Sequence, residues 1–529
     1  MQMTDLFSKQ CCLGTIGLIL AGFGTLFAVF WLDFLDTQIT NELKLAPNTR
    51  TFDTWKSPPL DMSIEIYLFN WTNYEDFGNA SVKPIVEELG PYVFREKPDK
   101  VDIVWHPENS TISFGKLSLF HFDAERSRGS LDDIITTVNI VALSAAETVR
   151  WKNYVEQKKV SLGLSLYNEE VHVTKTAREL LFDGYEDDLI EMAKEMSAFS
   201  SDIVVPFDRA GYFYMRNNSA SLMGRYNMFT GADDISKIGT IGNWNYGSRT
   251  RFFEGNCGMI NGSAGEFYPP HLQKDQVSFF SPDMCRTLPF DFETEYEVEG
   301  VLGYKYSGGA RTIDNGTLFP ENECFCAGEC MPSGVLNISS CRYGSPVFVS
   351  FPHFYGADPF YLDQVEGINP SKEKHEFFLT IEPTMGIPLE VAARFQLNLL
   401  IRPSSNIALY QDVPTVFFPV LWFQQKVTVS PELAADLRQV LCLPTIGYIC
   451  AGVVIIFGIL LILWFPLLKL ICRSERSSER QRDVEKEKSA PGPDEADSPL
   501  IFTNGIKSAE IKSQARSHAN RTSEKGSYN

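Results

Sequence analysis

The residues best suited to covalent chemistry in this chain are its cysteines. Eleven cysteines occur among 529 residues, and six of them fall within residues 257–341. An even, clustered set is typical of structural disulfide bonds in a segment outside the cytosol, where thiols are oxidised. Spacing alone leaves the pairing open, because many connectivities are possible. The six are Cys257, Cys285, Cys324, Cys326, Cys330 and Cys341.

Motifs for catalysis or metal binding are incomplete. His375-Glu376 starts like a zinc-protease motif but lacks its second histidine, and no Gly-x-Ser-x-Gly nucleophile elbow occurs. We therefore expect no catalytic residue, metal or cofactor, with an ectoenzyme built from scattered Asp, His and Ser as the remaining alternative. A net charge of −20 argues against a nucleic-acid-binding protein, which needs a basic face, because the Lys and Arg residues are scattered or confined to the C-terminal tail.

Two apolar runs frame the chain. Residues 446–468 carry no charge and would form a helix about 34 Å long, enough to cross a bilayer core of about 30 Å. Residues 11–32 form the second run, which is too long for a signal-peptide core and is typical of an uncleaved signal anchor. Lys9 precedes the first run, and Lys469 and Arg473 follow the last, which predicts that both termini are cytosolic.

This topology divides the chain into five parts. Residues 1–10 are a short cytosolic tail, 11–32 and 446–468 are spans, 33–445 form one ectodomain, and 469–529 are a polar tail that we expect to be disordered. Asn520 also lies in a glycosylation sequon, but its cytosolic place predicts that it stays unmodified. Seven sequons lie in the ectodomain and predict glycosylation at Asn70, Asn79, Asn109, Asn217, Asn261, Asn315 and Asn337.

Periodicity predicts a mostly β ectodomain with some helix. Apolar residues alternate over 62–68 and over 395–401, as half-buried strands require. Between them, apolar residues from Leu131 to Val149 recur at steps of three or four, which predicts a helix, and a second, less regular helix is expected over about 174–196. Ser430-Pro431-Glu432 predicts the cap and first turn of a helix leading into the last span.

Several strings, in their order and spacing, resemble the class B scavenger receptor family across both spans and nearly all of the ectodomain. They include Phe69-Asn70-Trp71-Thr72-Asn73, Glu88-Leu89-Gly90-Pro91-Tyr92, Phe267-Tyr268-Pro269-Pro270, Cys324-Phe325-Cys326, Pro352-His353-Phe354, Gly367-Ile368-Asn369-Pro370 and Ile381-Glu382-Pro383. The resemblance implies an α+β membrane protein: two transmembrane helices flanking an ectodomain with an antiparallel β-barrel core, a hydrophobic tunnel and a helical apex.

The function implied by the resemblance is lipid reception and transfer. Fatty acids, sterols, carotenoids or lipoprotein cargo would bind at the apex and move through the tunnel to the bilayer, at the plasma membrane or the endosomal-lysosomal membrane. The alternative is an adhesion or sorting receptor whose apex binds a protein partner. Small residues at Gly17 and Ala21, and at Gly447 and Ala451, permit close helix packing and hence span pairing or a homo-oligomer.

The resemblance also implies roles for individual cysteines. It pairs Cys257 with Cys324, Cys285 with Cys341, and Cys326 with Cys330, the last across a shorter spacing than in some members. Cysteines beside the spans on the cytosolic side resemble the family's palmitoylation sites, with unmodified thiols as the alternative. These are Cys11, Cys12 and Cys472, whereas Cys442 has no obvious partner.

The apex is expected to be built from helices at about 131–159 and 174–197. Lys152, Lys158 and Lys159 lie at the end of the first, where basic residues of the family attract acidic head groups or lipoprotein surfaces. We expect these lysines to attract ligand, with a solvated helix end as the alternative. The segment that starts the second helix carries one residue more than the family pattern, near Asp183.

The C-terminal tail contains a candidate sorting motif. Asp494 to Ile501 resembles the acidic dileucine signal for endosomes or lysosomes, with Leu500 and Ile501 as the dileucine pair. It departs from the signal because Ala496 stands where the acidic residue is expected and Glu495 lies one position earlier. A chance match in a polar tail is the alternative.

Overall fold

The computed structural model describes residues 2–58, 60–78, 81–197 and 205–487. By its internal contacts the chain forms two compact units, Met1–Gly22 with Ile455–Asn529, and Phe23–Val454. The second unit contains every strand of the described part.

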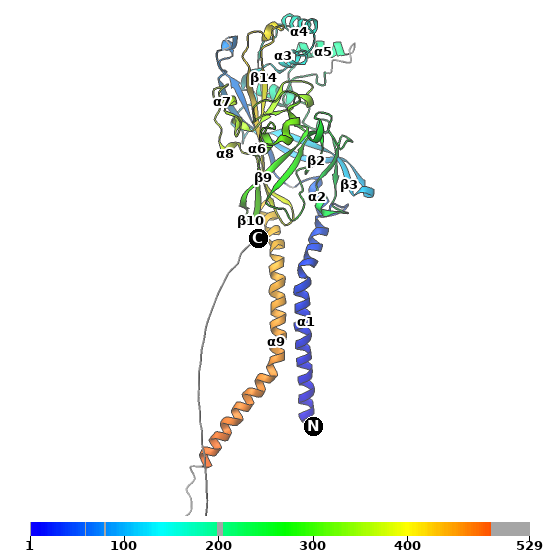
Figure 1. The fold of residues 1–529 in the computed structure, drawn as a ribbon, viewed down its shortest axis with the longest axis vertical. Coiled ribbons are helices and arrows are strands. Elements are labelled where there is room, and N and C mark those ends of the chain that lie inside the picture. Colours follow the sequence, from blue (N-terminus) through cyan, green and yellow to red (C-terminus); the bar gives the residue numbers. More distant parts are fainter. Residues whose placement is uncertain (1, 59, 79–80, 198–204, 488–529) are drawn as a thin grey trace, which may run out of the picture. The chain divides into compact units, whose positions relative to one another are not determined.

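A long helix stands at each end of the described chain (Figure 1). Helix α1 covers Gln2–Leu43 and α9 covers Pro431–Glu487, and their segments Gly14–Leu43 and Pro431–Trp464 are long and apolar enough to span a membrane. The two predicted apolar helices are thus confirmed. Helix α9 begins as expected, because the amide of Leu433 donates to Ser430 Oγ at 3.3 Å.

Small residues allow the two helices to touch within the smaller unit. A Cβ added to Gly17 would lie 2.7 Å from the carbonyl oxygen of Gly458, and one added to Gly458 would lie 2.7 Å from the amide nitrogen of Ala21. Larger side chains at these glycines would therefore push the helices apart. The predicted span pairing thus occurs within one chain, and a homo-oligomer stays a prediction.

Both tails are more helical than predicted. Helix α1 already begins at Gln2, and α9 continues through residues 469–487, where a disordered tail was expected. The low apolar content of this stretch excludes a packed core of its own but not a helix, because its Glu, Arg and Lys residues are good helix formers. Residues 488–529 lie outside the described part.

The ectodomain is built on one antiparallel sheet of 13 strands. The main path runs β7-β6-β3-β2-β1-β15-β14-β13-β10-β9-β8, with β12 paired to β14 and β11 to β12. Ser263 bridges to Thr240 beside one end strand and to Phe279 in the other, so the sheet is nearly closed into a barrel. The strands are β1 Met62–Trp71, β2 Val86–His106, β3 Thr111–Phe122, β6 Arg225–Phe229, β7 Ile241–Trp244, β8 Gln276–Ser281, β9 Arg286–Val298, β10 Val301–Ser307, β11 Leu336–Asn337, β12 Val347–Ser350, β13 Phe378–Glu382, β14 Ile387–Ile401 and β15 Val416–Thr428.

The two predicted strand segments belong to the two strands that flank β15 in the sheet. Residues 62–68 begin β1 and 395–401 end β14, and both strands pair with β15. Ile64, Ile66 and Leu68 are buried, as are Phe395 and Leu399. The fold class predicted from the sequence is confirmed, since the terminal apolar helices flank a β-rich domain with a barrel-like sheet.

The expected helix over 131–149 is wrong in its first half. Residues Ile134–Val138 form strand β4, which pairs with β5 (His172–Thr176), and helix α3 covers only Ile140–Thr148. Asn139 separates the two, since its Oδ1 accepts the amides of Val141 and Ala142, both at 3.1 Å. An N-cap side chain of this kind starts a helix, so the residues before it are left to pair as a strand.

The rest of the expected apex also differs in detail. Helix α4 covers Tyr154–Leu166 and α5 covers Asp188–Ser197, with a π-helical turn at Glu179–Asp183. A π turn accommodates one extra residue, which matches the insertion expected near Asp183. Figure 1 shows α3, α4 and α5 together at the end of the larger unit opposite its segments 23–43 and 431–454. The remaining short helices are α2 Arg50–Lys56, α6 Ala310–Ile313, α7 Pro359–Leu362 and α8 Lys372–His375.

The last residues of α1 and the first turns of α9 pack into the ectodomain core. Ile39 and Leu43 of α1 pack with Leu437 of α9 in a cluster that also holds Val298 and Val301 of the β9–β10 hairpin. Because burial of these side chains removes apolar surface from water, it stabilises the attachment of both helices to the barrel.

Candidate ligand-binding site

Helix α4 is held on the ectodomain by one polar face. The Gln157 Nε2 donates to the carbonyls of Arg150 and Lys152, at 3.0 and 2.9 Å, and its Oε1 accepts Asn406 Nδ2 at 2.8 Å. Ser161 Oγ accepts the amide of Ala408 at 3.0 Å. These bonds fix which side of α4 faces outward.

The outward side of α4 is apolar. Tyr154, Val155, Leu162 and Leu166 are 63%, 58%, 60% and 69% exposed, although such side chains normally favour burial. Residues 155, 162 and 166 repeat at helical spacing, and exposed Lys159 lies between them on the same side. Together with Lys158, these residues are called the α4 surface below. A contiguous exposed apolar group marks an interaction site more often than a solvated helix.

Two arginines contact Trp151, which lies just before the α4 surface in the chain. Trp151 is 81% exposed, and the guanidinium carbons of Arg150 and Arg402 lie 5.7 and 6.0 Å from its ring centre. Arg402 pairs with Glu147, and its Nη1 also reaches both Glu329 oxygens at 2.8 and 2.9 Å. Such two-pronged pairing holds the planar guanidinium in one orientation.

The three predicted lysines do not lie at the end of a helix, as was expected. Lys152 lies in the loop between α3 and α4, whereas Lys158 and Lys159 lie in the middle of α4, and all three are exposed. Lys158 Nζ lies 5.7 Å from the Tyr154 ring centre. Their role in ligand attraction stays a prediction. The exposed apolar residues beside them were not predicted from the sequence, although the helical spacing of 155, 162 and 166 could have indicated them.

A polar cluster around the buried side chain of His353 joins three of the strings that carry the family resemblance. His353 Nε2 lies 2.6 Å from Glu88 Oε2, and the Asn369 amide donates to His353 Nδ1 at 3.0 Å. Because Nδ1 accepts, the proton is on Nε2 and is donated to Glu88. Trp422 Nε1 donates to the same Glu88 oxygen at 2.7 Å. Burial acts to raise the pKa of Glu88, but these hydrogen bonds leave it below its usual value.

His375 is the second histidine of this cluster. His375 stacks on His353 with ring centres 4.4 Å apart, and its Nδ1 accepts the Ser371 amide at 2.9 Å. Burial, followed by the neighbouring His353, lowers the pKa of His375 to about 3. Both residues of His375-Glu376 are engaged in contacts within the fold: His375 accepts the Ser371 amide, and Glu376 forms an ion pair with Lys305 at 2.7 Å.

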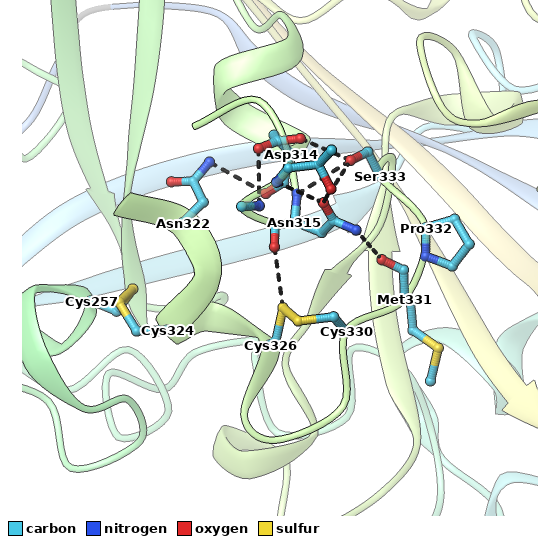
Figure 2. The surroundings of a disulfide bond; sticks show 12 residues. Cys257, Asp314, Asn315, Asn322, Cys324, Cys326, Cys330, Met331, Pro332 and Ser333 are labelled. Atoms are coloured by element: carbon cyan, nitrogen blue, oxygen red, sulfur yellow. Dashed lines mark hydrogen bonds between the residues drawn. A yellow bond between two sulfur atoms is a disulfide. The ribbon is translucent and has the colours of Figure 1, made fainter. Parts of the chain in front are cut away.

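Two of the three expected disulfides are formed. Cys257 is bonded to Cys324, and Cys326 to Cys330 (Figure 2). Cys285 and Cys341 are buried thiols that are not bonded to each other. A hydrogen bond between the two side chains, together with burial, raises the pKa of Cys285. The bond between Cys285 and Cys341 therefore stays a prediction. The two thiols contact each other, so oxidation could join them in a disulfide.

Figure 2 also shows a carboxylate that organises the loop beside the Cys326–Cys330 bond. Asp314 is 5% exposed, and its Oδ2 accepts the amides of Gly316, Leu318 and Phe319 at 2.9, 3.0 and 2.9 Å. Its Oδ1 accepts Ser333 Oγ at 2.9 Å. One side chain therefore satisfies four donors, and the three backbone amides among them bond no other acceptor in the described part of the chain.

Comparison with known proteins decides the family. The model of the CD36 family matches residues 15–469, which is most of the chain. The chain belongs to the CD36 family. It is 46% identical over 450 residues to Protein peste of Drosophila melanogaster, covering 84% of this chain and 80% of that protein. It is 32% identical to scavenger receptor class B member 1 of Cricetulus griseus, covering 85% and 87%, and 32% identical to lysosome membrane protein 2 of Mus musculus, covering 89% and 97%.

Membership of the CD36 family accounts for the coarse architecture. The chain is a scavenger-receptor-like membrane protein with two terminal apolar helices, and the family consists of receptors rather than enzymes. That both tails are cytosolic, with the β-rich domain outside, stays a prediction.

The sequons of this CD36-family chain differ in how far the fold engages them. Asn315 Nδ2 donates to the Met331 carbonyl at 2.7 Å, and Asn217 bonds both the amide and the carbonyl of Phe120. Asn261 is exposed, and its side chain bonds none of the residues that the structure describes. Asn79 lies outside the described residues. Glycosylation at all seven positions stays a prediction.

The remaining predicted sites fall where side chains are not described. Cys11 and Cys12 lie in α1 and Cys472 lies in α9, but their surroundings are outside the described part, as are Leu500 and Ile501. Palmitoylation and sorting therefore stay predictions. Cys442 is an exposed thiol of α9.

The hydrophobic tunnel expected for a CD36-family protein also stays a prediction. The described residues form a cavity of about 400 Å³ whose lining includes His106, Ser113, Asn227 and Tyr246. His106 Nε2 and Asn227 Nδ2 both bond Ser113 Oγ, at 3.0 and 3.1 Å. Val104 and Tyr226 also belong to this lining, which mixes polar and apolar side chains.

Acidification is expected to stabilise the helices next to the α4 surface. Burial, followed by the charge of Asp187, raises the pKa of Glu169. Glu169 lies beside the start of α3, where its Oε2 accepts a hydrogen bond from Asn139 Nδ2 at 2.7 Å. Burial also raises the pKa of Asp187, which directly precedes α5. A raised pKa in the folded state gives stability that is complete below the unfolded value, about 4, and is lost as pH rises through the folded value. Hydrogen exchange in α3 and α5, corrected for intrinsic rates, should slow at lower pH.

The control for this prediction is Glu169→Gln, which removes one of the two titrations while keeping an acceptor for Asn139. The variant should show a weaker pH dependence of exchange than the wild type. An unchanged dependence in the variant would assign the effect to other groups.

Proposed function

We propose that this protein is a receptor that binds lipid or lipoprotein ligands at the α4 surface and passes lipid through the ectodomain to the membrane. The observation that carries the proposal is the exposed apolar side of α4 with lysines set into it. Apolar side chains can insert between acyl chains while lysines contact acidic head groups. Membership of a family of scavenger receptors supports the same conclusion.

The transfer step needs no chemistry. Moving an apolar ligand from one apolar surface to another avoids a cost of about 25 cal/mol for each Å² exposed to water. A lined path through the ectodomain would keep that surface covered from the α4 surface to the bilayer. Plasma membrane and endosomal-lysosomal membranes are both proposed locations, and Leu500 and Ile501 would serve as the sorting signal for the second.

Charge reversal on α4 should weaken ligand binding. In Lys158→Glu/Lys159→Glu, each reversal replaces an attraction worth about 1 kcal/mol at an anionic surface by a repulsion, so binding should fall at least about tenfold. Vesicles of phosphatidylserine and phosphatidylcholine, floated with the full-length protein in detergent-free nanodiscs, measure the change. The loss should shrink at high salt, since exposed charges are screened.

Two variants make this result interpretable. Lys83→Glu/Lys374→Glu changes the same number of exposed lysines elsewhere and should leave binding unchanged. Leu162→Ser/Leu166→Ser removes apolar contacts and should weaken binding to neutral vesicles as well, which the charge variant does not. If the α4 charge variant bound acidic vesicles as well as the control variant does, the lysines would have no part in ligand attraction.

The second candidate is a sorting or adhesion receptor whose α4 surface binds a protein. The spacing of Val155, Leu162 and Leu166 favours it, because an apolar helix stripe also suits a groove or helix on a protein partner. Solvent extraction of the purified protein followed by mass spectrometry separates the two. Stoichiometric lipid supports the first candidate, whereas a lipid-free ectodomain with a protein retained at α4 supports the second.

A further inference from the structure

The outer face of strands β3, β6 and β7 carries a row of polar side chains. Ser113 of β3 stands opposite Asn227 of β6, which stands opposite Asn243 of β7. Phe114 follows Ser113 in the strand and is fully buried, so Ser113 and its row point away from the core. All three residues line a cavity of about 400 Å³. This volume lies within the range of small-molecule sites, about 300–1,000 Å³.

The polar row has hydrogen-bonding capacity that the fold does not use. Asn227 Nδ2 donates to Thr111 Oγ1 and to Ser113 Oγ, at 2.9 and 3.1 Å, but its Oδ1 accepts no hydrogen bond from the described residues. Within the same ranges, the side-chain amide of Asn243 bonds no other residue. A side-chain amide offers two donors and an acceptor without a net charge. Such groups suit the hydroxyl and acetamido groups of a sugar better than an ion.

An exposed aromatic side chain lines the same cavity. Tyr246 is 87% exposed and shares with Asn245 a two-residue turn that hydrogen bonds between Trp244 and Gly247 close. Both central residues have a positive φ, 49° for Asn245 and 67° for Tyr246. Such turns favour glycine, and a bulky residue in this conformation is strained. Strain held at an exposed position indicates a functional ring, and an aromatic ring offers a flat apolar surface to the C–H face of a sugar.

The chain itself can supply the sugar. Asn109 ends the turn between β2 and β3, is exposed, and begins a glycosylation sequon. Its Oδ1 accepts Thr111 Oγ1 at 2.7 Å, and the same hydroxyl accepts Asn227 Nδ2 of the polar row. Asn109 Nδ2, the atom to which a glycan attaches, bonds none of the residues that the structure describes. The four residues from Asn109 to Ser113 span at most about 14 Å, a length that the first sugars of a glycan cover.

We propose that the first sugars of an N-linked glycan on Asn109 lie in this cavity, with one sugar ring against Tyr246 and polar groups bonded to Asn227 and Asn243. The docked glycan crosses β3, β6 and β7, and β7 ends the main path of the sheet. An end strand is paired less completely than a central one, so the glycan braces the barrel beside its seam. This role does not depend on lipid binding at the α4 surface.

The test measures how fast peptide-N-glycosidase releases each glycan from the native full-length protein in nanodiscs. Expression in cells that make only oligomannose glycans gives every site the same substrate, and mass spectrometry counts the conversion of Asn to Asp at each site. Asn337 is the reference, because its Oδ1 also bonds within its sequon, to the Ser339 amide at 3.0 Å. Release at Asn109 should be about tenfold slower, since a glycan docked for about nine-tenths of the time is available for one-tenth. Denaturation should make the two rates equal.

Tyr246→Gly is the decisive variant, because glycine suits the positive φ and removes the ring without straining the turn. It should raise release at Asn109 to the rate at Asn337, whereas the matched control Tyr246→Phe keeps the ring and should leave release slow.

Three results would overturn the proposal. They are an Asn109 without a glycan, equal release at Asn109 and Asn337 in the wild type, and slow release at Asn109 that Tyr246→Gly leaves unchanged. Asn261 is the competing source, because the Ile241 amide of β7 donates to the carbonyl of neighbouring Gly262. A response to Tyr246→Gly at Asn261 in place of Asn109 would assign the cavity to that glycan and also overturn the proposal.

Discussion

Replacement of Asp314 by alanine is expected to lower the free energy of unfolding of the ectodomain by at least about 3 kcal/mol. The carboxylate accepts three backbone amides and the Ser333 hydroxyl, and the side chain is almost fully buried. Its removal leaves these donors unpaired in the interior, where each costs about 1–3 kcal/mol. Thermal unfolding of the full-length protein in nanodiscs, followed by near-ultraviolet circular dichroism, measures the effect.

Asp363→Ala is the control for this experiment. Asp363 is exposed, and its side chain makes no hydrogen bond within residues 205–487, so its loss should change the unfolding temperature little. The Asp314 variant should also show slower or incomplete closure of the Cys326–Cys330 bond, because the ordered loop brings those residues together. An unfolding temperature equal to that of the control variant would show that the loop does not depend on the carboxylate.

The same carboxylate should withstand an acidic compartment. Burial acts to raise the pKa of Asp314, but the hydrogen bonds from Phe319, Ser333, Gly316 and Leu318 leave it below its usual value. A lowered pKa in the folded state gives stability that is present above the unfolded value, about 3.9, and is lost only as pH falls through the folded value. At about pH 5 the Asp314 contribution is therefore complete.

Local periodicity predicted the fold where one face of an element is buried. The alternation over 62–68 identified β1, since apolar and polar residues alternate between core and outside. It failed at β4, where four successive residues, Ile135 to Val138, are all buried and no alternation remains. Steps of three and four through that run also fit a helix, and only the capping by Asn139 separates strand from helix.

The candidate sites depend on contacts that the sequence order does not contain. The lysines of α4 were predicted because a basic group is visible along the chain, but the direction in which α4 faces depends on Gln157 and Ser161 bonding the loop at 406–408. Glu88, His353 and Trp422 are far apart in the sequence and meet only because the fold brings β2, β15 and the segment at 352–354 together. The disulfide pairing came from family resemblance, since spacing left it open.

Release of the ectodomain from its spans is expected to preserve ligand binding and abolish delivery to a bilayer. The structure sets where to cut, because Ile39, Leu43 and Leu437 belong to the ectodomain core and must stay with it. Residues 33–445 retain that cluster. Without spans, a ligand with about 400 Å² of apolar surface would have to cross water at a cost of about 10 kcal/mol. Vesicles that contain a quenched fluorescent fatty acid acceptor measure transfer from the loaded fragment and from the full chain.

The decisive control restores attachment without restoring the natural spans. The fragment carries a terminal histidine tag and is captured on vesicles that contain nickel-chelating lipid, so proximity to the bilayer returns while the orientation imposed by α1 and α9 does not. Recovery of delivery on capture would mean that proximity alone is sufficient. Continued loss would mean that the two helices, joined to the barrel through the cluster around Leu43 and Leu437, orient the proposed lipid path toward the bilayer. Equal delivery by the untethered fragment and the full chain would remove the spans from the transfer step, because the ligand would then cross water unaided.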